Sequence, residues 1–227
     1  MQIKATDGSG EFDVYVVEPS QKPAGAVVLI QEIFGVNDAL REQARWVADL
    51  GFFAVCPDLF WRIEPGVQIT DKTDAEWKHA FALMNAFDHD KGMEDLKATL
   101  ASARTLKGSN GRAGTMGFCL GGRLAFRMGI ESDADINISY YGVALDGLIG
   151  GLDRVSKPLI CHVADRDQYF PPEGRAKLDQ AALGRDKVTI HHYNADHAFA
   201  RPNGVHWQAL AATIANGRSA EALAKYL

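Results

Sequence analysis

The stretch TMGFCLGGRLAF, residues 115–126, decides how the fold of this chain is interpreted. Its centre, GFCLG, fits the frame glycine–any–nucleophile–any–glycine, with Cys119 between Gly117 and Gly121. An apolar run precedes this centre and a helical pattern follows it. In such a strand–turn–helix unit the turn is so sharp that the residues two positions from the nucleophile must be small. We therefore predict that Cys119 lies on a strained turn between a strand and a helix.

A thiol at this turn is chemically suited to nucleophilic attack. A free thiol is partly ionised at neutral pH, and the positive end of the following helix favours the thiolate. The backbone amide of Leu120 can donate a hydrogen bond to an oxyanion. The alternative is that Cys119 is a buried structural thiol, and five residues of pattern alone do not exclude this.

The composition is that of an ordinary globular protein. Of 227 residues, 47% are hydrophobic and 23% are charged, and the net charge is −5 without a long run of like charge. This argues against a nucleic-acid or membrane-surface partner. No segment resembles a signal peptide or approaches the roughly 20 apolar residues of a membrane span. The three cysteines are widely separated, which is typical of a reducing compartment, so we expect a cytoplasmic protein.

Short apolar runs alternate with helical patterns along the chain. The predicted strands are 12–19, 25–32, 52–59, 112–118, 136–142, 158–165 and 188–194, and the predicted helices are 37–51, 74–87, 93–108, 120–130, 172–184 and 204–217, with an irregular stretch at 60–73. This alternation indicates an α/β fold: a mostly parallel sheet with helices on both faces. No linker or repeat interrupts it, so we expect one domain over 1–227.

Residues that follow a strand of such a sheet lie at the edge where ligands bind. Asp165 and Asp167 follow one predicted strand, and His197 follows the next. The order nucleophile, acid, histidine is the order of a catalytic triad in this fold class. We predict His197 as the base because the other histidines lie within a predicted strand or helix or precede Cys119: His79, His89, His162, His191, His192 and His206.

Five segments together resemble the dienelactone hydrolase family: QEIFGVN (31–37), VCPDLF (55–60), GFCLGG (117–122), ADRDQYFPPE (164–173) and HAFARP (197–202). They span most of the chain and occur in the order of the family. The resemblance implies an α/β-hydrolase fold and a Cys–His–Asp triad. It also implies an activity toward an enol-lactone, carboxymethylenebutenolide (dienelactone), which the family opens to maleylacetate.

The resemblance implies a role for each matching residue. Cys119 is the nucleophile, His197 the base and Asp167 the acid, because the family's aspartate lies four residues before the proline here numbered Pro171. Asp165 is the alternative acid.

Other matching residues surround this triad. Glu32 matches a glutamate near the thiol, where a carboxylate can accept the thiol's hydrogen bond. The amide of Ile33 would be the second oxyanion donor beside Leu120. Arg201 matches an arginine that binds the substrate carboxylate, although a surface arginine is an equally good interpretation.

The chain departs from the family around the expected substrate. Trp77 and Phe81 stand where the family typically has an arginine and a tyrosine that contact the substrate, and Ala198 stands in place of a serine. We therefore expect Trp77 and Phe81 to line a less polar site, on which neutral aryl esters compete well with dienelactone. Dienelactone would remain a good substrate if Lys78 or Arg62 supplied the missing positive charge.

The leading hypothesis is a hydrolase that opens a lactone or cleaves a carboxylic ester through an acyl-enzyme, with dienelactone-like substrates first. The alternatives are a carboxylesterase or thioesterase with a less polar substrate and, less favoured, a non-catalytic binding protein. Four retained site residues argue against the last. We expect no metal and no cofactor, because the chain has neither HExxH-like spacing nor a GxGxxG after a strand.

Overall fold

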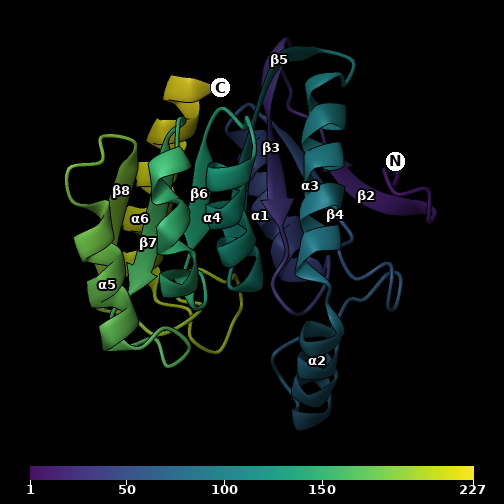
Figure 1. Ribbon diagram of the computed structural model, residues 1–227. Coiled ribbons are helices and arrows are strands. Elements are labelled where there is room, and N and C mark those ends of the chain that lie inside the picture. The colour runs from purple at the N-terminus through teal and green to yellow at the C-terminus, as the bar shows by residue number, and fades with distance from the viewer.

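The strands form one eight-stranded sheet (Figure 1). The computed structural model describes residues 1–227. In space the strands follow the order β1-β2-β4-β3-β5-β6-β7-β8. β2 is antiparallel to β1 and β4, and all neighbours from β4 to β8 are parallel. The strands are β1 (Gln2–Lys4), β2 (Glu11–Val17), β3 (Ala24–Ile30), β4 (Phe53–Pro57), β5 (Ser109–Phe118), β6 (Asn137–Tyr140), β7 (Leu159–Ala164) and β8 (Val188–Tyr193).

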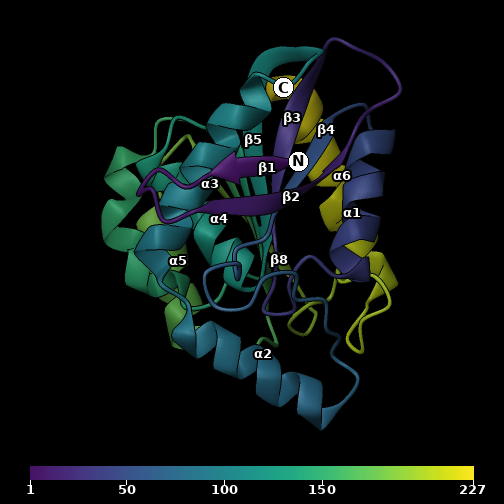
Figure 2. The same cartoon turned by 90° about the vertical axis from the view of Figure 1, so that its right-hand side faces the viewer.

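Helices cover both faces of the sheet, as predicted. Figure 2 shows α3, α4 and α5 on one face, α1 and α6 on the other, and α2 beyond the end of the sheet. The helices are α1 (Asp38–Asp49), α2 (Asp74–Ala86), α3 (His89–Arg104), α4 (Leu120–Glu131), α5 (Pro172–Ala182) and α6 (Ala209–Tyr226), with a 3-10 helix η1 (Leu145–Arg154). The mostly parallel α/β architecture expected from the sequence is therefore confirmed.

The central strand β3 shows why the strands read as unbroken apolar runs. All seven of its residues are buried. Val28 and Ile30 pack into the core beneath α3 and α4, whereas Val27 and Leu29 pack into the core beneath α1 and α6. A parallel strand covered on both faces has no polar side, so both sets of side chains must be apolar.

The last helix differs from its prediction. The pattern predicts a helix over 204–217, but α6 spans Ala209–Tyr226. The residues before it form turns, closed by bonds from the amide of Gly204 to Arg201 O and from the amide of Trp207 to Gly204 O. His206 therefore lies in a loop. The helix continues past Gly217 because an interior glycine costs only about 1 kcal/mol and faces open space here.

Other elements also differ from the sequence predictions. α3 spans His89–Arg104 instead of 93–108, because Asp88 caps the amides of Asp90 and Lys91 at its start and Thr105 caps its end. β1 was not predicted, since three residues are too short for a periodic signal. η1 was not predicted either, because its glycines weaken the helical pattern. No helix of the chain is both long and apolar enough to cross a membrane.

A buried hydrogen-bonded network joins the sheet to α6. His162 of β7 contacts the hydroxyls of Tyr193 through Nδ1 at 2.8 Å and of Ser219 through Nε2 at 3.0 Å. Ser219 also contacts the Tyr140 hydroxyl at 2.7 Å. Burial lowers the pKa of His162 well below its usual range, and the charges of His191 and Arg218 lower it further. The native protein therefore holds His162 neutral.

This network predicts a loss of stability in acid. The unfolded chain binds a proton at residue 162 below a pKa of about 6.5, but the native chain does not, so the free energy of unfolding falls as the pH drops through that value. When the pH falls from 7 to 5, we expect the free energy of unfolding to decrease by roughly 2 kcal/mol more in the wild type than in His162→Gln. Urea denaturation at the two pH values measures this difference. Identical losses in the two proteins would contradict this assignment.

Candidate active site

Cys119 lies on a sharp turn between β5 and α4. Its backbone has φ 56° and ψ −115°, a conformation that L-residues rarely adopt and that costs about 1–3 kcal/mol. A Cβ atom on Gly117 would lie 1.9 Å from the carbonyl oxygen of Gly121, and one on Gly121 would lie 2.2 Å from that of Ile30. Both glycines are therefore required sterically, and the turn predicted from the sequence is present.

His197 and Asp167 meet in the loops that follow β8 and β7. The His197 Nδ1 atom lies 2.6 Å from Asp167 Oδ2, and Asp167 Oδ1 accepts a hydrogen bond of 2.7 Å from the amide of Tyr169. Asp165, the alternative acid, is exposed and lies 2.7 Å from His192 Nδ1. Of the two carboxylates, Asp167 is thus the one that orients His197.

The His197 imidazole is buried, with 6% of the residue exposed. Burial alone would lower its pKa, but the negative charge of Cys119 and the hydrogen bond to Asp167 raise the pKa to about 10. The Nε2 atom is buried and makes no hydrogen bond of normal geometry. When Cys119 is ionised, the imidazole therefore retains its proton at neutral pH.

Two backbone amides are available for an oxyanion. Leu120 is the first residue of α4, where no preceding helical turn supplies an acceptor for its amide. Ile33 lies in the turn after β3, makes no backbone hydrogen bond through its amide and lines the same cavity as Cys119. Both residues predicted to form an oxyanion hole are thus placed at the carboxyl edge of the sheet.

Glu32 and Arg201 form a buried ion pair. Arg201 Nε donates to Glu32 Oε2, whereas Glu32 Oε1 is buried without a partner. Burial would lower the pKa of Arg201, but Glu32 and other nearby negative charges raise it above its usual range. The Tyr141 hydroxyl is also buried without a partner, and its pKa is raised first by burial and then by the charge of Glu32.

An apolar cavity of about 160 Å³ adjoins Cys119. Its wall from α2 includes Trp77, which stacks on Phe81 at 5.6 Å between ring centroids and meets Phe34 edge-on at 5.1 Å. The residues that line the cavity are Ile33, Phe34, Trp77, Phe81, Met84, Cys119, Val143, Tyr169, His197 and Arg201. Trp77 and Phe81 therefore border the cavity beside the thiol, where a bound molecule would contact them.

Neither Lys78 nor Arg62 adds a charge to this cavity. Lys78 is exposed and is absent from the cavity wall. Arg62 is held elsewhere by Asp95, with Nε and Nη2 donating over 3.1 and 2.9 Å, and by Asp7. Arg201 is thus the only arginine or lysine that lines this cavity.

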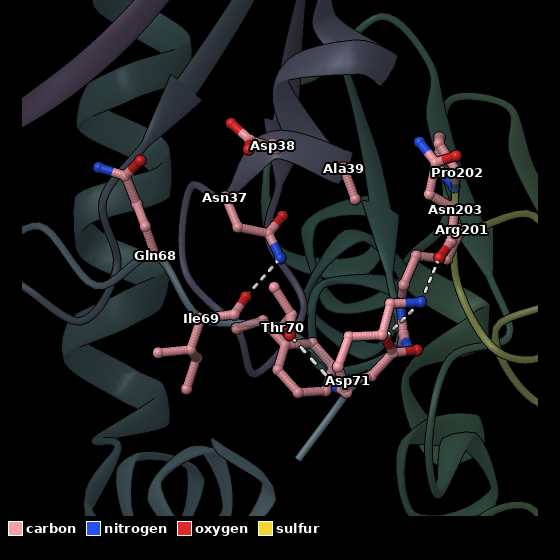
Figure 3. A pocket seen from close by; sticks show the side chains of 12 residues that line it. Asn37, Asp38, Ala39, Gln68, Ile69, Thr70, Asp71, Arg201, Pro202 and Asn203 are labelled. Atoms are coloured by element: carbon pink, nitrogen blue, oxygen red, sulfur yellow. Dashed lines mark hydrogen bonds and ion pairs between the residues drawn. The ribbon is translucent and has the colours of Figure 1, made fainter.

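Among the residues at the site that the sequence analysis did not single out, two contact its key side chains. Tyr169 covers His197 with its ring, edge-on at 4.8 Å, and follows Asp167 by two positions. Asp71 lies in the irregular stretch before α2 and accepts a hydrogen bond of 2.7 Å from Arg201 Nη1 (Figure 3). The loop after Asp167 offered a signal for Tyr169, but no local pattern distinguishes Asp71.

The fold and this site define an α/β-hydrolase. The crystal structure of a provisionally assigned dienelactone hydrolase from Klebsiella pneumoniae superimposes with a TM-score of 0.84 over 100% of this chain and 98% of that chain, at 20% identity. Residues 12–227 match the sequence model of the Dienelactone hydrolase family. The chain belongs to the dienelactone hydrolase family.

Two relatives align over almost their whole length. A protein of Azospirillum brasilense, provisionally named carboxymethylenebutenolidase, is 48% identical over 100% of this chain and 98% of its own. Carboxymethylenebutenolidase 1 of Cupriavidus pinatubonensis is 38% identical over 99% of this chain and 95% of its own. The family resemblance inferred from the five segments is confirmed.

The electrostatics of His197 can be measured directly. We expect Cys119→Ala to lower the pKa of His197 from about 10, because the negative charge that most raises it is removed while burial continues to lower it. A histidine NMR titration of both proteins checks this. The signal of His192, held by Asp165 and Asp179, serves as the control. An unchanged His197 pKa would show that the thiol and the imidazole do not interact.

Proposed function

We propose that the chain hydrolyses a lactone or a carboxylic ester, with Cys119 as nucleophile, His197 as acid and base, and Asp167 as the group that orients the imidazole. The observation that carries this proposal is the 2.6 Å contact between His197 and Asp167 beside the cavity that contains Cys119. Membership of the dienelactone hydrolase family supports the same chemistry.

The first half-reaction forms an acyl-enzyme. The Cys119 thiolate attacks the carbonyl carbon, and the carbonyl oxygen becomes an oxyanion that the amides of Leu120 and Ile33 stabilise. The tetrahedral intermediate collapses as the carbon–oxygen bond to the leaving group breaks. His197 Nε2 gives its proton to the departing oxygen. The product is a thioester, and in a lactone the leaving oxygen stays attached through the opened ring.

The second half-reaction releases the product. Neutral His197 takes a proton from water, whose oxygen attacks the thioester carbon. Asp167 stabilises the imidazolium that forms and holds the ring in the tautomer that presents Nε2. Collapse of the second intermediate expels the thiolate and leaves a carboxylic acid. Glu32 Oε1, which is buried and unpartnered, is available to accept a hydrogen bond from the Cys119 thiol before substrate binds.

The cavity favours small substrates with an apolar group. Its volume of about 160 Å³ is modest, and its aromatic wall of Trp77 and Phe81 suits a flat or aliphatic moiety. The carboxymethylenebutenolidase names of the relatives support dienelactone as a first substrate. The apolar wall favours a second candidate, a carboxylesterase or thioesterase with an uncharged substrate. Hydrolysis of dienelactone and of neutral 4-nitrophenyl esters should therefore be compared by kcat/KM.

The nucleophile has a direct test. We expect Cys119→Ala to lower kcat by at least about 10³-fold, because no other group can form the thioester. Hydrolysis is followed by product release, and the acyl-enzyme by mass spectrometry. Cys161→Ala, which changes a buried thiol of β7 outside the cavity, is the matched control. Activity of Cys119→Ala equal to that of the control would exclude Cys119 as the nucleophile.

The acid has a test of its own. We expect Asp167→Asn to lower kcat by roughly 10⁴-fold, because an amide favours the wrong imidazole tautomer. Asp165→Asn should cost far less, since Asp165 contacts His192 on the surface. Steady-state kinetics of the two variants compare these effects. A larger loss for Asp165→Asn would reverse the assignment.

A further inference from the structure

The guanidinium group of Arg201 is bound on two sides by buried carboxylates. Its Nε donates to Glu32, and its Nη1 donates to Asp71 Oδ2 over 2.7 Å. Only 5% of Arg201, 9% of Glu32 and 6% of Asp71 are exposed. The ring of Phe34 lies over the guanidinium, with the central carbon 4.8 Å from the ring centroid. The free protein therefore already supplies partners for this cation.

Asp71 is held firmly in this position. Its Oδ2 atom also accepts a hydrogen bond of 3.1 Å from the amide of Val205, and its carbonyl oxygen accepts one of 3.1 Å from Trp77 Nε1. Lys72 Nζ lies 3.4 Å from Oδ1, but half of the lysine side chain is exposed. The lysine charge is thus screened by solvent, whereas the Asp71–Arg201 pair is not.

Arg201 and Phe34 belong to the walls of two cavities. One is the apolar cavity beside Cys119, and the other is a polar pocket of about 200 Å³ that contains Asp71. Figure 3 shows Asp71 and Arg201 reaching toward each other across the polar pocket, with Asp38 at the far side. Asp71 therefore contacts Arg201 from the polar pocket and does not line the substrate cavity itself.

We propose that Asp71 is a specificity-determining residue that competes with a substrate carboxylate for Arg201. The inference rests on the proposed function, because it concerns which esters and lactones enter the cavity beside Cys119. The buried groups Glu32, Asp71 and Arg201 carry two negative charges and one positive charge, and the exposed Lys72 is screened by solvent, so a carboxylate that enters adds a further uncompensated negative charge to a buried site. An uncharged substrate of the same shape meets no such penalty.

Asp71→Asn separates charge from shape. The asparagine carbonyl still accepts from the amide of Val205, but residue 71 no longer neutralises Arg201. We compare 4-acetoxybenzoate with 4-acetoxybenzamide, which differ by one charge. The ratio of their kcat/KM values should rise about tenfold in favour of the benzoate, mainly through KM, since a charge-assisted hydrogen bond becomes available. Asp71→Glu, which restores the charge, should return the ratio toward that of the wild type.

Asp38→Asn is the matched control. Asp38 lines the same polar pocket and loses the same charge, but it is exposed and makes no ion pair with Arg201. Its ratio should stay that of the wild type. If Asp71→Asn and Asp38→Asn give the same ratio, while both substrates are hydrolysed, the inference is overturned and the proposed function stands. If the wild type hydrolyses neither substrate, nor dienelactone, nor 4-nitrophenyl esters, the proposed function fails.

Ligand binding tests the competition without turnover or a fragile variant. In the wild-type protein, calorimetry should show benzoate binding no more tightly than benzamide, because Asp71 and Glu32 already pair with Arg201. Benzoate binding at least tenfold more tightly than benzamide would show that Arg201 is open to carboxylates and would overturn the inference. This measurement can overturn the inference even if Asp71→Asn does not fold.

Discussion

The left-handed backbone at Cys119 is the constraint on which the site depends. With φ at 56°, the chain reverses from β5 into α4 within one residue. This reversal requires the backbone of Gly121 to touch the carbonyl end of β3, so the same contact brings the turn after β3 to the start of α4. Ile33, which follows β3, and Leu120, which starts α4, consequently come from two different elements but lie at the same edge of the sheet. A side chain at residue 121 would separate them.

Much of this arrangement follows from local sequence, but part of it cannot. The glycines around Cys119 and the positions of Asp167 and His197 after their strands are properties of short segments, so the turn and the contact between acid and histidine were predictable. Asp71 is different because its partner, Arg201, is 130 residues away. A periodic pattern carries no information about such a long-range contact. The start of α6 is missed for another reason, because the turns before Ala209 are local but irregular and leave no periodic signal.

The polar groups of the site form two sets, one with several hydrogen bonds and one without hydrogen-bond partners. Asp71 and the guanidinium of Arg201 are hydrogen-bonded on several sides, which fixes them in place. By contrast, Glu32 Oε1, the Tyr141 hydroxyl and His197 Nε2 are buried and have no partner. Unsatisfied buried polar atoms are rare and costly in native proteins, and these three are consistent with the proposed site because a bound molecule could supply their missing partners.

Cys119 and His197 follow strands of the sheet, whereas part of the cavity wall comes from α2. The helix lies beyond the sheet (Figure 2), and Ala80 and Leu83 are its only fully buried residues. Thr73 caps its first turn by accepting from the amide of Glu76, so its start does not depend on the sheet. Residues of α2 that face the cavity can therefore vary without disturbing the strands that carry the thiol and the histidine. Such a division lets a lineage acquire new substrates by mutation of one peripheral helix while its chemistry is inherited intact.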